Sequence, residues 1–439
     1  MALKRHTNDV NEREPLLQTG TGRGKQSTFS FITSPVWWNL LFAVLYVGGQ
    51  VGQNITLPLW LSEIKGGNPY WVVWFGSIWF TAFFGLVTLC LILFGALPEI
   101  QRRISHPWMI VVGASDAING ILVVFASDPT RTAPYLQSIL GNFIIPITIL
   151  CRIAMLPRGD PDRIPSRTQW FTAAAVMVGI FLAAVPTMFN MELPNSCAGP
   201  TDGVGGTARI LWPMCFMLGF VPAAVMNVAS EIFLKRRKSS LEKTAWTERN
   251  VQAAVNEHPS DVLAAGEAVE ATNKEERPNV FVFLFWESAY QSLIVTALFW
   301  TDIIPGFGTS ETLSDWWGNF RGGWECFSGE LGCSGSTTTR GIVYIFMYII
   351  SYIGSSFLLR DDQGANWVAV IQSPVTPLCV LFWSLFNACP FGWHPEFLNT
   401  TWWTLGGLAL MCPAMVIYHR AERRRDVHTG HGDELEGPR

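Results

Sequence analysis

Two carboxyl groups fall inside long apolar stretches of this sequence, where a charged side chain is costly. Asp116 lies within HPWMIVVGASDAINGILVVFA, about 12 Å from the start of a predicted span, and Glu287 lies at a similar depth in VFVFLFWESAYQSL. A carboxyl group in hydrocarbon must face a polar cavity, find a partner or carry a proton. We therefore predict proton coupling by Asp116 and Glu287; the alternative is a static hydrogen bond to a neighbouring helix.

Uncharged polar side chains recur in the same apolar stretches and could bind a solute. The predicted solute-binding residues are Asn54, Gln137, Asn142, Asn227, Gln291, Gln372 and Ser373. Some such residues join helices by hydrogen bonds worth under about 1 kcal/mol each. Their concentration in a few spans favours one shared central cavity.

Residue patterns typical of enzymes are absent from the sequence. The seven histidines lie in predicted tails, loops or interfaces, and no HExxH, GxSxG or phosphate-binding glycine loop occurs. We therefore expect no catalytic residue, no metal site and no cofactor.

The composition indicates an integral membrane protein. Of 439 residues, 49% are hydrophobic and only 15% are charged, whereas soluble proteins carry about 25% charged residues. The net charge of −4 offers no basic excess for nucleic acid. The expected environment is the lipid bilayer.

The expected fold is all-α, with ten apolar stretches long enough to cross about 30 Å of hydrocarbon. They are 37–61, 70–95, 108–127, 133–156, 168–189, 210–234, 280–300, 341–359, 364–386 and 400–418. Tails and loops on one side hold 24 lysines and arginines, against five on the other, so both termini are predicted to be cytosolic. The N-terminal tail lacks the apolar run of a cleavable signal and is expected to be disordered.

Spans four and nine suggest an internal repeat. An offset of 231 residues aligns Pro146 with Pro377 and Asn142 with Ser373, so each proline kink follows a polar residue by one turn. Five spans separate the two helices, so the copies cross in opposite directions, which is typical of secondary transporters. The alternative is two unrelated kinked helices. The predicted parts are a tail at 1–36, a first five-helix repeat at 37–189, a second at 210–234 with 280–418, a cytosolic loop at 235–279, a lumenal loop at 301–340 and a tail at 419–439.

The lumenal segments carry candidate covalent modifications. Cys326 and Cys333 share one predicted lumenal loop and are the expected disulfide, because oxidation is permitted on that side. The same loop contains SDWWGNFRGGW, which suits a helix lying in the membrane interface. Asn399 begins a sequon and is a candidate glycosylation site.

The cytosolic segments carry two short motifs. Glu12, Leu16 and Leu17 form an acidic dileucine pattern, which a sorting adaptor could bind, and which favours a lysosomal or vacuolar membrane. Residues 235–238 are Lys-Arg-Arg-Lys, an expected anchor for anionic lipid; a site for a regulatory partner is the alternative.

Several ordered motifs together resemble the chloroquine resistance transporter-like family of the drug/metabolite transporter superfamily. They are ASDAINGILVVFASDPTRTAPYLQSILGNFIIPITIL, VPAAVMNVASEIFLKRR, IIPGFG and VAVIQSPVTPL. The resemblance implies ten helices in two inverted five-helix repeats. It also implies a carrier that exports small, cationic or peptide-like solutes from an acidic vacuole or lysosome by alternating access, coupled to protons. Glu287 has no acidic counterpart in that pattern, and two cysteines stand where the family's loop has four.

Two other functions remain open from the sequence. A nucleotide-sugar or organic-anion exchanger of the secretory pathway should place Lys or Arg in its cavity, and only Arg152 lies inside a span. A receptor or scaffold should carry a structured soluble domain, whereas no tail or loop exceeds about 45 residues.

Overall fold

The structure is a computed structural model, in which the contacts divide the chain into two units, residues 1–40 and 41–439. It describes residues 35–64, 68–98, 102, 104–158, 163–189, 208–253, 279–330, 332–333, 335–360, 368, 371–372, 374–388, 391–395, 401–414 and 416–417. The described part of the first unit begins helix α2. The second unit holds all remaining elements.

Within the described ranges, eight helical segments are long and apolar enough to cross a membrane. They are α2 (Pro35–Leu61), α3 (Pro69–Leu93), α5 (His106–Ala126), α6 with η1 and α7 (Pro134–Met155), α8 (Arg167–Met188), the first part of α9 (Ala208–Ala253), α11 (Val280–Ala297) and α13 (Gly335–Arg360). They coincide with the first eight predicted spans. The prediction of an all-α integral membrane protein is confirmed.

The ninth and tenth predicted spans are helical in part. Helix α15 (Val375–Leu385) is apolar but has only 11 residues, and residues 401–414 are helical. The second of these segments packs closely on α8, because a Cβ added at Gly407 would lie 2.5 Å from the Gly179 carbonyl oxygen. Ten spans and the inverted repeat therefore stay predictions.

The predicted fourth span is not one continuous α-helix. Helix α6 (Pro134–Leu140) passes into a 3₁₀ turn, η1 (Gly141–Phe143), before α7 (Ile144–Met155) begins. Pro146 lacks the N–H that would bond the carbonyl of Asn142, and its ring crowds that carbonyl. The interruption thus lies directly before the proline that the sequence singled out.

The loop predicted at 235–279 begins as helix. Helix α9 continues from the membrane span to Ala253, so residues 235–253 are helical. Leu, Glu, Lys, Arg and Ala dominate this segment, and their high helix propensity accounts for the continuation of the helix. Residues 254–278 lie outside the described part of the chain.

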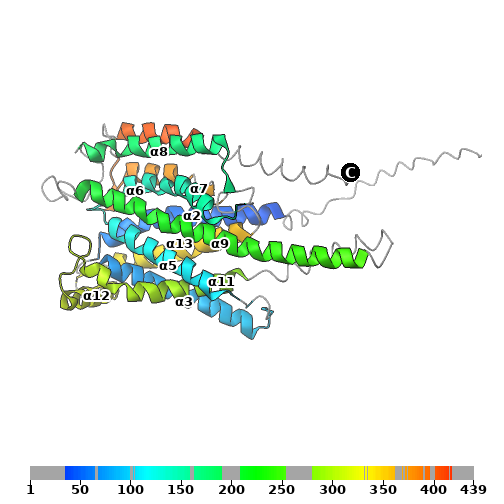
Figure 1. The fold of residues 1–439 in the computed structure, drawn as a ribbon. Helices are drawn as coiled ribbons and strands as arrows, with labels where there is room; N and C mark the ends of the chain where they lie inside the picture. Colours follow the sequence, from blue (N-terminus) through cyan, green and yellow to red (C-terminus); the bar gives the residue numbers. More distant parts are fainter. Residues whose placement is uncertain are drawn as a thin grey trace, which may run out of the picture. The chain divides into compact units, whose positions relative to one another are not determined.

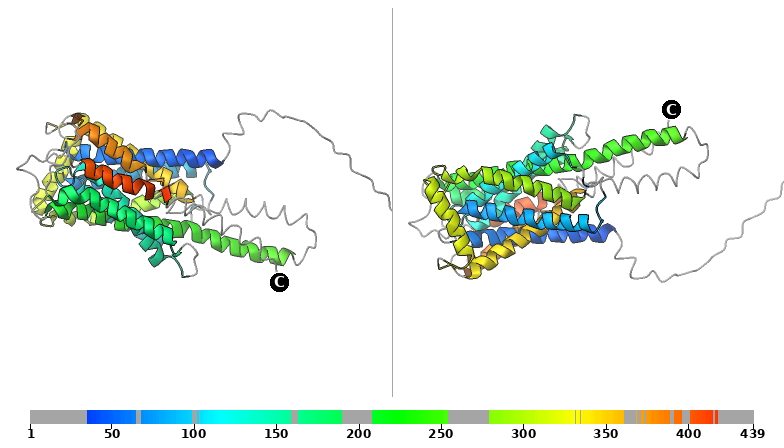
Figure 2. Two further views of the ribbon diagram at one scale, coloured as in Figure 1. Left: turned by 90° about the horizontal axis from the view of Figure 1, so that it is seen from above. Right: turned by 90° about the horizontal axis from the view of Figure 1, so that it is seen from below.

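One end of the spans carries further structure, here named the α12 end. A 3₁₀ helix, η3 (Phe299–Ile303), leads to α12 (Leu313–Phe327), the amphipathic helix predicted for the SDWWGNFRGGW segment. Figure 2 shows α12 running across the ends of the spans. A short antiparallel hairpin, β1 (Phe386–Ala388) with β2 (Phe391–Trp393), follows α15 and was not predicted.

The spans within residues 41–439 run alongside one another (Figure 1). Helix α5 packs against α9 and α11, and α11 also packs against α3. Fully buried aromatic rings fill the core near α12, where Trp71 stacks on Phe75 at 4.7 Å between ring centroids. These contacts hold α5 and α9 beside the cavity described next, and α13 packs on both α9 and α11.

Candidate functional site

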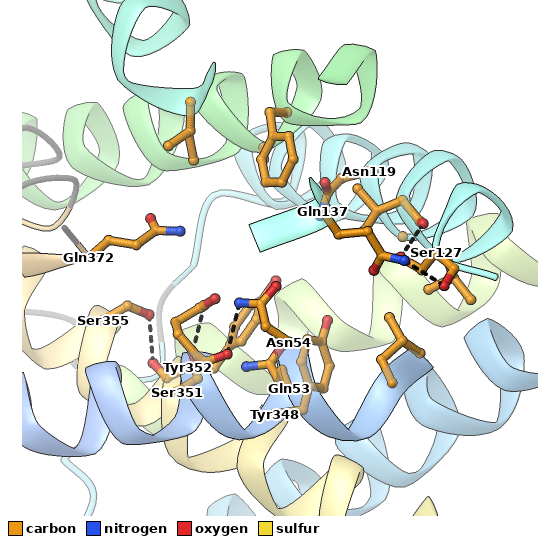
Figure 3. Close-up of a pocket in the computed structure, with 18 of the residues that line it drawn as sticks. Gln53, Asn54, Asn119, Ser127, Gln137, Tyr348, Ser351, Tyr352, Ser355 and Gln372 are labelled. Atoms are coloured by element: carbon orange, nitrogen blue, oxygen red, sulfur yellow. Dashed lines mark hydrogen bonds between the residues drawn. The ribbon is translucent and has the colours of Figure 1, made fainter. Parts of the chain in front are cut away.

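A cavity of about 160 Å³ lies among α2, α5, α6, α9 and α13 (Figure 3). Its polar lining residues are Tyr46, Gln50, Gln53, Asn54, Asn119, Ser127, Gln137, Asn227, Tyr344, Tyr348, Ser351, Tyr352, Ser355 and Gln372. The described lining residues include no charged side chain. Amides and hydroxyls both donate and accept hydrogen bonds, so this wall suits a solute with polar groups of either kind.

Helix α2 forms one wall of the cavity and is bonded to α13. Asn54 Nδ2 donates to the Gln50 carbonyl oxygen at 2.9 Å, and Gln50 Nε2 donates to Ser351 Oγ at 2.8 Å. Gln53 Nε2 is buried and has no hydrogen-bond partner in the described structure. A bound solute can supply the acceptor that this amide lacks.

Three tyrosines at a spacing of four residues form the α13 wall. Tyr344 stacks on Tyr348 with ring centroids 6.1 Å apart, and Tyr348 lies 4.7 Å from Tyr352. From α3, the Phe80 ring packs at 4.7 Å from Tyr348 and 4.8 Å from Tyr352. The rings therefore pack as a continuous layer, with their hydroxyl groups at its edge.

Asp116 lies behind this tyrosine layer and does not line the cavity. Its side chain is 1% exposed. Tyr352 Oη donates to Asp116 Oδ1 at 2.7 Å, and Tyr348 Oη lies 3.4 Å from Asp116 Oδ2. Two hydroxyl groups of the cavity wall thus satisfy a carboxyl group in the interior of the protein.

Glu287 of α11 is a second buried carboxyl group and interacts electrostatically with Asp116. Helices α5 and α11 cross closely at Gly113, where an added Cβ would lie 2.8 Å from the Glu287 carbonyl oxygen. One turn further, Gln291 Nε2 donates to Tyr348 Oη at 3.2 Å. Among the described residues, neither carboxyl group forms an ion pair with Lys, Arg or His.

Gln137 and Gln372 line the cavity from helix ends. Gln137 Nε2 donates to the carbonyl oxygens of Ser127 at 2.8 Å and Thr132 at 2.7 Å, so its amide holds the connection between α5 and α6. Gln372 accepts a 3.1 Å hydrogen bond from Tyr46 Oη. Both hydrogens of the Gln137 amide nitrogen are thus engaged, so a solute would meet Gln137 as an acceptor, through its amide oxygen.

The predicted solute-binding residues therefore fall into three groups. Asn54, Gln137, Asn227 and Gln372 line the cavity. Asn142 and Gln291 are buried outside its wall, where each donates to a neighbouring helix. Ser373 lies outside the described residues, as do Asn399 and the motif residues Glu12, Leu16 and Leu17.

Sequence reasoning did not single out the tyrosines. The signal was present in YIFMYIISY, where every fourth residue is tyrosine and therefore falls on one helical face. In an apolar span, aromatic rings at this spacing are equally expected of a helix face that only packs against its neighbours. The position of Asp116 on the facing helix gives two of the hydroxyl groups a carboxyl acceptor, which the spacing alone does not reveal.

A buried ion pair joins α7 and α9 at the end of the spans opposite α12. Arg152 Nη2 lies 3.2 Å from Glu231 Oε1, and their side chains are 5% and 1% exposed. The sequence places Arg152 inside a span, and its charge is matched there by a carboxylate of the neighbouring helix. A nearby carboxylate replaces the water that the guanidinium would otherwise seek.

At the α12 end, Glu63 connects α2 with α13. Arg340 Nη1 lies 3.0 Å from Glu63 Oε1, and Ser336 Oγ donates to Glu63 Oε2 at 2.7 Å. A disulfide joins Cys326 to Cys333 beside this contact, with Cα atoms 5.2 Å apart. These links tie the end of α12 to the start of α13.

The model of the CRT-like, chloroquine-resistance transporter-like family matches residues 40–246. The match covers the first six spans and includes Asp116, Gln137 and Asn227. No curated protein matches the chain.

Proposed function

The chain belongs to the CRT-like, chloroquine-resistance transporter-like family and is a multi-pass membrane transporter, and from this premise we propose its mode of action. It exports small cationic or peptide-like solutes from an acidic vacuole or lysosome. Export is coupled to protons and proceeds by alternating access. Both termini face the cytosol, and the α12 end faces the lumen.

One observation carries this proposal: an uncharged polar cavity lies beside two buried carboxyl groups within the spans. Tyr348 and Tyr352 line the cavity and also contact Asp116. Glu287 interacts with Asp116 from the facing helix. A carrier that moves a proton with its solute needs these two features close together, since each must influence the binding of the other.

The charges of the site favour cationic or neutral solutes over anions. No lysine or arginine is among the described lining residues, and Arg152, the arginine within span four, is paired with Glu231. A phosphate or sulfate group would therefore meet no positive charge in the cavity. This argues against the nucleotide-sugar or organic-anion exchanger.

The acidic compartment is supported by the N-terminal sequence and by the site. Glu12, Leu16 and Leu17 provide a dileucine signal on the side assigned to the cytosol. A lumen rich in protons would load Asp116 and Glu287 before the site opens to the cytosol, and the neutral cytosol would then accept the protons. The solute leaves with them.

Uptake into liposomes under an imposed pH gradient tests the proposal. Purified protein is supplied with radiolabelled lysine, glycylglycine or glutathione, and Asp116→Asn is measured beside the wild type. We expect gradient-driven accumulation by the wild type and its loss in Asp116→Asn, with folding checked by thermal melting. Accumulation that ignores the gradient would contradict proton coupling, and gradient-driven exchange of a nucleotide sugar alone would favour the exchanger.

A further inference from the structure

The carboxyl group of Asp116 is separated from the cavity by hydroxyl groups that touch both. Tyr348 and Tyr352 are lining residues, and their Oη atoms lie 3.4 and 2.7 Å from the two Asp116 carboxyl oxygens. The shorter contact belongs to Tyr352. A solute in the cavity therefore meets these tyrosines and not the carboxyl group itself.

The direction of the Tyr352 hydrogen bond depends on whether Asp116 carries a proton. A carboxylate only accepts, so the Tyr352 hydrogen must point toward Asp116 and its oxygen lone pairs are turned to other neighbours. A carboxylic acid donates, so the Tyr352 oxygen can accept from it and the Tyr352 hydrogen can turn away. In the protonated state the proton remains bonded to Asp116 and is not transferred to Tyr352.

The groups around Tyr352 leave the cavity as the main destination for that hydrogen. Phe80 of α3 closes one side with its ring. Met226 of α9 offers only a sulfur atom at 3.9 Å, which is a weak acceptor, and it also lines the cavity. Reorientation of one O–H bond therefore changes what the cavity presents to a solute.

The other titratable and polar groups near Asp116 come from three elements. Glu287 faces it from α11, Asn119 lies one turn away on α5, and Tyr344 belongs to the same α13 ladder as Tyr348 and Tyr352. The Asn119 Oδ1 atom is buried without a partner and belongs to a lining residue. The Asn119 side chain also hydrogen-bonds Asp116, and because Oδ1 has no partner this bond is made by the amide nitrogen. An amide N–H only donates, so this bond cannot reverse as the bond of the Tyr352 hydroxyl can.

We infer that Tyr352 is a positioning residue that transmits the protonation state of Asp116 to the cavity by reversing its hydrogen bond. This role rests on the proposed proton-coupled transport, in which Tyr352 would link the proton on Asp116 to the solute in the cavity. Tyr348 contributes less, because its contact with Asp116 is longer and its oxygen already accepts from Gln291 Nε2 at 3.2 Å.

Infrared difference spectroscopy tests this link without any solute. Protein in liposomes is compared at acidic and neutral pH, and the carboxylic acid C=O band and the tyrosine C–O band are followed. In the wild type both bands should change together. Asp116→Asn should abolish both changes, whereas Tyr352→Phe should keep the C=O change and lose the tyrosine change.

Tyr70→Phe is the control, because Tyr70 is not among the lining residues of the cavity and its hydroxyl donates to the Val295 carbonyl oxygen at 3.0 Å, a group that does not titrate. It should leave both bands as in the wild type. A tyrosine change that persists in Tyr352→Phe overturns the inference. If Tyr352→Phe does not fold, a wild-type tyrosine change that survives in Asp116→Asn overturns it equally, and its loss there supports it.

Transport of radiolabelled lysine, glycylglycine and glutathione supplies a separate measurement. Tyr352→Phe should exchange solute across the membrane without a gradient but lose about tenfold in gradient-driven accumulation, the effect of one hydrogen bond to a charged group. Tyr70→Phe, which lies outside the lining residues of the cavity, should accumulate as the wild type does. Wild-type transport that ignores pH would contradict the proposed function, whereas gradient-driven accumulation retained in Tyr352→Phe would contradict this inference alone.

Discussion

Asn142 Nδ2 donates a 2.7 Å hydrogen bond to Thr376 Oγ1 and thereby joins the 3₁₀ turn of span four to the start of α15. Thr376 in turn donates to the Ser138 carbonyl oxygen at 3.0 Å. All three residues are buried. The contact lies one residue before Pro377 and one turn before Pro146. The two proline-containing segments therefore meet at the interruption of span four and at the start of α15.

Thr376→Val should destabilise the protein, because it removes both hydrogen bonds and leaves the Asn142 amide buried without its partner. The expected loss in free energy of unfolding is about 1–3 kcal/mol. Thermal melting in detergent measures it. Thr339→Val is the control, since Thr339 is exposed and bonds only within its own helix. Equal melting temperatures for the two variants would contradict a structural role for the contact.

Arg152 and Glu231 should show strong coupling in a double-mutant cycle. Arg152→Met or Glu231→Gln alone leaves one charged or polar group buried beside α7 and α9, at a cost of roughly 3–5 kcal/mol. The double variant removes both charges and should cost less than the sum. Unfolding free energies of the four proteins give the coupling term. Additive losses would mean that each side chain acts through other contacts.

The sequence was sufficient for the spans but not for the arrangement around the site. Apolar length alone locates a helix in a membrane, which is why α3 and α5 lie where they were predicted. The broken span four was also foreseen in part, because Pro146 cannot complete the helical hydrogen bonds. Local chemistry determines both features.

The contacts around Asp116 depend on residues far apart in the chain. Asp116 and Tyr352 are 236 positions apart, and no periodicity links them. The same applies to Arg152 and Glu231, which are 79 positions apart and form one buried pair. The residues predicted to bind solute were chosen by polarity, and polarity does not distinguish the cavity wall, where Asn54 lies, from the buried contact of Asn142.

Loss of the Cys326–Cys333 disulfide should lower stability moderately. The bond closes a short loop between α12 and α13, and chain entropy predicts a contribution of about 2–3 kcal/mol for such a loop. Cys326→Ser with Cys333→Ser should melt at a lower temperature than the wild type. Non-reducing peptide mapping should recover the two cysteines in one cross-linked species. Labelling of both thiols in unfolded, unreduced protein would show that the bond is not formed.

Glycosylation of Asn399 should show whether the ninth span crosses the membrane. Helix α15 alone is about 16 Å long, so residues before Val375 must contribute if this segment is to cross about 30 Å. If it crosses, Asn399 lies in the lumen, because an odd number of spans precedes it; if it does not, Asn399 lies in the cytosol and stays unmodified. We expect a shift in electrophoretic mobility on glycosidase treatment, lost in Asn399→Gln.

Two controls make the result independent of how efficiently a glycan is attached. Asn54→Gln removes the other sequon, which lies within α2, and should leave the mobility shift unchanged. Glu396→Cys places a thiol next to the sequon, where a membrane-impermeant maleimide added to the lumenal side should label it. Labelling of that thiol only from the cytosolic side, together with unmodified Asn399, would limit the protein to eight spans and contradict the inverted repeat. Lumenal labelling supports ten, since a C-terminal tail on the cytosolic side then requires residues 401–414 to belong to a crossing helix as well.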